Sequence, residues 1–189
     1  THTYKGNTSG NTNYTSNSSG VTYYVLVNKG TLQLSITGDQ TVTYPTQTTV
    51  TGTETNAGDT DITYQLWRNT TLVDSTSPYT ESITLGAADY IYRFNATSGA
   101  NYTANLTGVT STVIVNKGST STSCSLSPSS PTTYETATTA YCYSNSTTKC
   151  SMFRNSTNIT TENNTEIYLG AADYTYVCNV TSTANYSSS

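Results

Sequence analysis

Apolar and polar residues alternate along several segments of this 189-residue chain. The alternation is clear over residues 23–27, 32–36, 90–94 and 113–115, which are rich in Thr, Tyr, Val, Leu and Ile. A period of two in such segments is typical of half-buried β-strands, and no segment keeps the 3.6-residue period of a helix. The pattern therefore predicts an all-β protein.

Segments of the sequence recur in the same order about 84 to 88 residues apart. Residues 25–30, Val-Leu-Val-Asn-Lys-Gly, return as Val-Ile-Val-Asn-Lys-Gly at 113–118, and Leu-Gly-Ala-Ala-Asp-Tyr occurs at both 85–90 and 169–174. A period of this length is the size of a small β-sandwich domain. We therefore predict tandem repeats at 25–112 and 113–189. Residues 1–24 match the end of a repeat, and the repeat at 113–189 is expected to lack its last strand.

Turn residues divide each repeat into short strands. In the first repeat we expect strands near 31–37, 48–55, 61–68, 79–84, 88–97 and 106–116.

The motif Leu-x-Ala-x-Asp-Tyr-x-Tyr-x-Cys, which ends at Cys178, carries a family resemblance. With a closing Val-x-Val-Asn-Lys and an Asn-Tyr-Thr segment, the chain resembles the bacterial group-3 immunoglobulin-like repeats, which also occur in archaeal surface proteins. The resemblance implies tandem immunoglobulin-like β-sandwiches displayed at the cell surface. It also implies that Tyr176 is a tyrosine corner, whose hydroxyl bonds to the backbone upstream.

All four cysteines lie in the second repeat, and their spacing fits no zinc site. Disulfides in an oxidising, extracellular setting are the better interpretation. Four cysteines allow three pairings. The resemblance places Cys142 opposite Cys178, which leaves Cys124 to pair with Cys150.

Thirteen of the 18 asparagines begin an Asn-x-Ser/Thr sequon, about twice the number that this Thr- and Ser-rich composition gives by chance. Strand alternation around Tyr92 and Phe94 predicts that Asn95 faces water, and Asn179 follows in the same phase. We therefore expect a dense coat of N-linked glycans. The candidate sites are Asn7, Asn13, Asn17, Asn69, Asn95, Asn101, Asn105, Asn145, Asn155, Asn158, Asn163, Asn179 and Asn185.

Charge and composition argue against several other classes of function. A net charge of −4 with only seven Lys and Arg disfavours nucleic acid as a partner, and no apolar run is long enough for a membrane helix. The single histidine, His2, gives no base for a catalytic triad. Asp59 and Asp61 could bind calcium, but further ligands at suitable spacing are missing. We expect no enzyme activity, no cofactor and no metal.

The sequence therefore predicts a structural subunit of a glycosylated extracellular fibre or stalk. In one version, residues of about 8–27 form a donor strand that completes the 113–189 repeat of an adjacent copy, so that copies join head to tail. The donor residues would be Tyr14, Val21, Tyr23, Val25 and Val27. In the other version, the 189 residues are a window of a longer covalent array. An adhesin or carbohydrate-binding module, with an exposed aromatic cluster, is the alternative from a different class.

Overall fold

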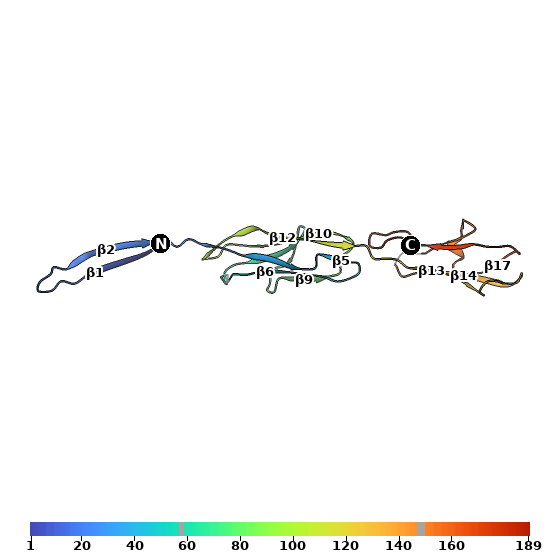
Figure 1. The fold of residues 1–189 in the computed structure, drawn as a ribbon, viewed down its shortest axis with the longest axis horizontal. Helices are drawn as coiled ribbons and strands as arrows, with labels where there is room; N and C mark the ends of the chain where they lie inside the picture. Colours follow the sequence, from blue (N-terminus) through green and yellow to red (C-terminus); the bar gives the residue numbers. More distant parts are fainter. Residues whose placement is uncertain (57–58, 147–149) are drawn as a thin grey trace.

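The computed structural model describes residues 1–56, 59–146 and 150–189, and the prediction of an all-β protein is confirmed. One 3₁₀ turn, η1 (Thr160–Glu162), is the helical element in the described residues. Figure 1 shows three bodies in a row along the long axis: a hairpin, a first sheet pair and a second sheet pair.

The first sheet pair, which we call the first sandwich, has a five-stranded sheet and a three-stranded sheet. The order in the larger sheet is β5-β12-β10-β7-β8, with bounds Thr41–Thr43, Asn105–Asn116, Ala88–Ala96, Tyr64–Arg68 and Thr71–Asp74. The order in the smaller sheet is β4-β6-β9, with bounds Leu34–Gly38, Thr48–Glu54 and Thr80–Ile83. All six predicted strands of this repeat are present, with ends shifted by at most three residues. Strand β5 runs parallel to β12, and the other pairs are antiparallel.

The core of the first sandwich lies between these two sheets. Leu66, Tyr92 and Phe94 are fully buried, and Val50 comes from the facing sheet. Full burial of each such side chain contributes about 1.5–3 kcal/mol. Gly52 is required opposite Phe94, because a Cβ at Gly52 would lie 2.4 Å from the ring.

The second sheet pair, the second sandwich, has two three-stranded sheets. Their orders are β13-β14-β17 and β16-β15-β18. The first has bounds Thr122–Ser127, Ala137–Ser144 and Glu166–Tyr168, and the second has bounds Thr157–Asn158, Ser151–Arg154 and Tyr176–Asn179. Met152 and Val180 are buried between the sheets.

The hairpin at the other end consists of β1 (His2–Thr8) and β2 (Asn17–Val25). A short parallel pair, β3 (Gly30–Thr31) with β11 (Tyr102–Thr103), lies where the chain enters the first sandwich. Nearly every residue of the hairpin is exposed. An isolated two-stranded hairpin is only marginally stable in water.

Candidate functional site

The hairpin reproduces the pairing of β10 with β12 position by position. His2 pairs with Val25 as Tyr90 pairs with Val113, which is the same register moved by 88 residues. Both pairs are interrupted by a bulge at the same place, between residues 6 and 8 in the hairpin and between 94 and 96 in the sandwich. Strand β2 is therefore the structural equivalent of β12.

A glycine at the bulge strengthens this equivalence. Gly20 has φ +63° and Gly108 has φ +69°, and each N–H donates to the side-chain oxygen of the asparagine three residues before it, at 3.0 and 2.9 Å. A side chain at either glycine would meet the carbonyl oxygen of the facing strand and would be strained in this left-handed conformation. The same backbone device closes both strand pairs.

The proposed donor residues are exposed in the hairpin although their equivalents in the first sandwich are covered. Val25 is 45 % exposed and Val27 is 68 % exposed, whereas their equivalents Val113 and Val115 are buried. The other donor residues, Tyr14, Val21 and Tyr23, are exposed as well. Tyr14 lies in the loop of the hairpin, outside the strands. Strand β2 and the residues that follow it thus present an apolar face of the kind that a sandwich buries.

The second sandwich has an open position for such a strand. Strand β18 is at the edge of its sheet among the described residues, whereas its equivalent β10 lies between β7 and β12. A groove of about 390 Å³ lies between residues 132–138 and residues 169–174, and the second of these segments precedes β18 in the chain. In the first sandwich, β12 occupies the corresponding place between β5 and β10. The groove therefore has the location of a missing strand.

The disulfide pairing differs from the one expected. The predicted bridges Cys142–Cys178 and Cys124–Cys150 are wrong: the structure pairs Cys124 with Cys178 and Cys142 with Cys150. Cys124 lies directly opposite Cys142 in the β13–β14 pair, and it reaches across to β18 on the other sheet. The sulfur atoms of Cys142, Cys150 and Cys178 lie within 4.8 Å of one another. The strand on which each cysteine lies therefore does not determine which two are bonded. The Cys124–Cys178 bridge links edge strands of the two sheets.

The sequons lie mostly at the surface. The prediction that Asn95 faces water is wrong. Its side chain is only 7 % exposed, and its amide Nδ2 donates to the carbonyl of Leu106 at 3.1 Å at the β-bulge. Asn105 and Asn185 are half-buried. The remaining ten are exposed: Asn7, Asn13, Asn17, Asn69, Asn101, Asn145, Asn155, Asn158, Asn163 and Asn179. Exposure supplies the room that an N-linked glycan needs, and their modification stays a prediction.

The tyrosine corner also lies elsewhere than expected. The hydroxyl of Tyr174, not that of Tyr176, donates to the backbone upstream, at 3.2 Å from the carbonyl of Gly170. Tyr90 makes the same bond to Gly86 at 3.0 Å. The two Leu-Gly-Ala-Ala-Asp-Tyr loops therefore share one internal hydrogen bond.

The polar groups of the first sandwich serve the fold. Tyr92 donates to Glu81 at 2.6 Å, and Glu81 also pairs with Arg68. Burial, followed by the bond to Glu81, raises the pKa of the Tyr92 hydroxyl. The carboxylates of the candidate calcium ligands Asp59 and Asp61 accept hydrogen bonds from the backbone N–H groups of residues 101 and 100, respectively. These bonds anchor the turn that leads into β11.

Comparison of the chain with protein families, with curated proteins and with solved structures found no match. Among the described residues, no helix is long and apolar enough to cross a membrane.

Proposed function

We propose that this chain is a structural subunit of an extracellular, N-glycosylated fibre built from immunoglobulin-like repeats, and that β2 of one copy fills the open strand position of the next copy. The observation that carries this proposal is the match between the two ends. Strand β2 has the register and the bulge of β12, its Val21 and Val25 match Val109 and Val113, and the second sandwich has a groove where the last residues of β12 lie in the first. Because one end fits the other, the contact repeats without closing and gives a filament.

The equivalence predicts the register of the proposed contact. Tyr176 of one copy faces Tyr23 of the next, and Cys178 faces Val21, as Tyr92 faces Ser111 and Phe94 faces Val109 in the first sandwich. In the same register Val27 would lie between residues 132 and 172, which both line the groove. The backbone of β18 gains a ladder of hydrogen bonds, and the valines leave water.

Strand β1 must leave β2 for this contact to form, because β1 and β18 would pair with the same edge of β2. The exchange replaces a hairpin that is exposed on both faces by a strand laid against the core around Met152 and Val180. Burial of apolar area at about 25 cal/mol per Å² favours the exchanged state. The hairpin thus stores the donor strand in the single copy.

Surface composition supports an extracellular fibre. Charged residues are only 10 % of the chain, and exposed sequons are spread over the hairpin and both sandwiches. Glycans on the asparagines that lie outside the contact between copies would hydrate the surface and block unspecific pairing of strand edges. The two disulfides fit an oxidising compartment.

The test is filament formation by matched charge variants of the full chain. Val25→Asp with Val27→Asp places carboxylates where β12 has buried valines, so we expect loss of filaments in electron micrographs. Leu26→Asp is the control, because its equivalent Ile114 is 41 % exposed within the sandwich. All three side chains are exposed in the single copy, so its fold is unaffected. Equal filament formation by the double variant and by the wild type would contradict the proposal.

A carbohydrate-binding module is the second candidate. Tyr134 and Tyr168 are 65 % and 73 % exposed and line one hollow of the second sandwich, which is the kind of surface on which a sugar ring stacks. Binding of free oligosaccharides to immobilised protein, abolished by Tyr168→Ala, would favour this candidate. The fibre proposal expects no such binding.

A further inference from the structure

The two sandwiches meet through a small polar and aromatic junction. The N–H of Ala87, in the Leu-Gly-Ala-Ala loop of the first sandwich, donates to Oδ1 of Asn185 at 2.9 Å. The next residue, Tyr186, packs edge-on against Tyr44, with ring centroids 5.3 Å apart. Gly86 leaves room for the asparagine, since a Cβ there would lie 2.9 Å from Asn185 Oδ1. One loop and one tyrosine on the first sandwich therefore receive an Asn-Tyr pair.

The receiving half of this junction occurs again on the second sandwich, where nothing among the described residues covers it. Residues 169–174 repeat the loop sequence, and the hydrogen bond from Tyr174 to Gly170 copies that from Tyr90 to Gly86. Tyr134 corresponds to Tyr44, because the same turn encloses each of them. The N–H of residue 136 bonds to the carbonyl of 133 as 46 bonds to 43. Open space surrounds Gly170: a Cβ there would meet only the Tyr174 hydroxyl, at 3.8 Å.

The inserting half occurs again on the first sandwich. Asn101 and Tyr102 correspond to Asn185 and Tyr186, and the same bonds fix both pairs to the preceding Lys-Gly segment. The N–H of Gly30 donates to the carbonyl of Asn101 at 2.8 Å, as Gly118 does to Asn185 at 2.9 Å.

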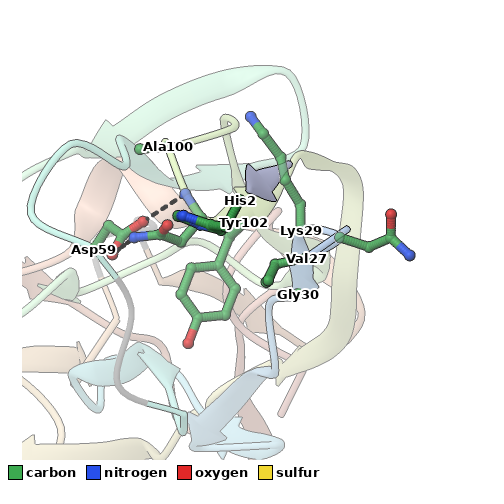
Figure 2. A pocket seen from close by; sticks show the side chains of 9 residues that line it. His2, Val27, Lys29, Gly30, Asp59, Ala100 and Tyr102 are labelled. Atoms are coloured by element: carbon green, nitrogen blue, oxygen red, sulfur yellow. Dashed lines mark hydrogen bonds between the residues drawn. The ribbon is translucent and has the colours of Figure 1, made fainter. Parts of the chain in front are cut away.

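The preceding lysine is fixed in the same way. Its ammonium group bonds to a backbone carbonyl at 2.6 Å in both repeats, Lys29 to Gly99 and Lys117 to Thr183. Asn101 and Tyr102 line a hollow of about 440 Å³ together with Val27, Gly30 and His2 (Figure 2).

We propose that the contact between two copies of this chain repeats the geometry of the internal junction. In this contact Asn101 and Tyr102 of one copy bind the 169–172 loop and Tyr134 of the next. Asn101 Oδ1 accepts from the N–H of Ala171, and the ring of Tyr102 packs edge-on against Tyr134. This inference rests on the proposed fibre and adds a contact that the strand exchange itself does not contain.

The position of His2 fits this arrangement. His2 corresponds to Tyr90 and therefore to Tyr174 of the second sandwich. When β1 leaves β2, His2 leaves the hollow that it lines in Figure 2, and Tyr174 of the neighbouring copy takes its place. Strand exchange and loop docking thus occupy one connected surface.

Oxidative tyrosine cross-linking of filaments tests the inference with an internal control. Filaments are assembled from an equal mixture of unlabelled and ¹⁵N-labelled chains, and cross-linked peptides are identified by mass spectrometry. The Tyr44–Tyr186 cross-link must form within one chain, and we expect a Tyr102–Tyr134 cross-link between chains of different label. Filaments that give the first cross-link but not the second overturn this inference alone. Absence of filaments overturns the proposed function and this inference with it.

Three variant pairs at the exposed end give an independent test. Tyr134→Ala should weaken association about two- to twelvefold, the range of one aromatic pair, whereas Tyr168→Ala in the same hollow should not. Ala171→Pro removes the donor N–H and should weaken association at least as much, whereas Ala171→Gly keeps it. Gly170→Val should block docking while the thermal unfolding of the single copy stays unchanged, and Gly170→Ser serves as the smaller step. Equal association by the paired variants, measured by sedimentation, contradicts the proposal.

Discussion

Asparagine side chains in this protein support the backbone at positions that also carry sequons. Asn69 and Asn155 occupy the same place in the two repeats, both have positive φ, and both accept a backbone N–H at 2.9 Å, from Ile91 in β10 and from Thr175 just before β18. Asparagine tolerates this left-handed conformation better than most residues. Their recurrence therefore has a structural reason in addition to any glycan.

Asn95 gives a prediction at the level of one residue. Its amide is buried and bonded to the carbonyl of Leu106, so an oligosaccharyltransferase cannot reach it in the folded chain. We expect peptides that contain Asn95 to be unmodified in glycopeptide mass spectrometry, whereas exposed Asn158 carries sugar. A fully occupied Asn95 would show that modification precedes folding of this strand pair.

Asp74 gives a pH-dependent prediction. The backbone N–H of Thr76, at 2.9 Å, lowers the pKa of this carboxyl below its ordinary value of 3.8; burial opposes the shift, and the N–H of Thr80 adds to it. A folded pKa below the unfolded value contributes stability at neutral pH that is lost as the pH falls through the folded pKa. We expect the free energy of unfolding of the Asp74→Asn variant to depend less on pH in the acid range than that of the wild type. Unfolding is monitored by the fluorescence of Trp67. An unchanged acid limb in the variant would argue against this role.

At the scale of elements, the sequence predicted where most strands lie but not which segments they contact. Period-two alternation located β4, β10 and β12, and turn residues located β6, β7 and β9. Neither signal located β5 and β8, because three or four residues are too short for a period to be visible. The burial of Asn95 was also missed, since a bulge shifts the alternation by one residue and only the partner strand creates it.

The candidate site was predictable only in part. The internal repeat identified the end strand with Val21, Val25 and Val27, because the copied sequence fixes the structural equivalents. The groove between residues 132–138 and 169–174 and the junction around Asn185 depend on contacts between distant segments, and no local pattern encodes them. The disulfide pairing failed for the same reason.

The disulfides lead to a prediction about the second sandwich. The two cysteines of the Cys124–Cys178 bridge are 54 positions apart in the sequence, and those of the Cys142–Cys150 bridge are 8 positions apart. On the chain-entropy estimate these are worth about 4 and about 2.5 kcal/mol. We expect Cys124→Ser with Cys178→Ser to lower the free energy of unfolding more than Cys142→Ser with Cys150→Ser, measured by denaturant titration. Non-reducing peptide mapping checks the pairing itself, and a Cys142–Cys178 peptide would contradict it.

At the scale of the whole molecule, hairpin and sandwiches follow one another along a single axis (Figure 1). Such an arrangement places each module in contact with its sequence neighbours alone, as in other tandem arrays. The linker segments 25–30 and 113–118 are bound in the same way by the module that follows them. A fibre assembled as proposed would therefore have nearly identical junctions within and between chains. We expect its cryo-electron microscopy map to show modules at one even spacing rather than in alternating pairs.

The residue that corresponds to the buried Asn95 at the bulge of β10 affects the order in which glycosylation and assembly can occur. Asn179 occupies the place of Asn95, and it is exposed because no strand covers it in the single copy. A sugar transferred to Asn179 would fill the space that the arriving β2 needs, so a glycosylated end cannot elongate. The enzyme that decorates the chain would then also set the length of the polymer: we expect Asn179 to be bare in filaments and modified in subunits that fail to join them.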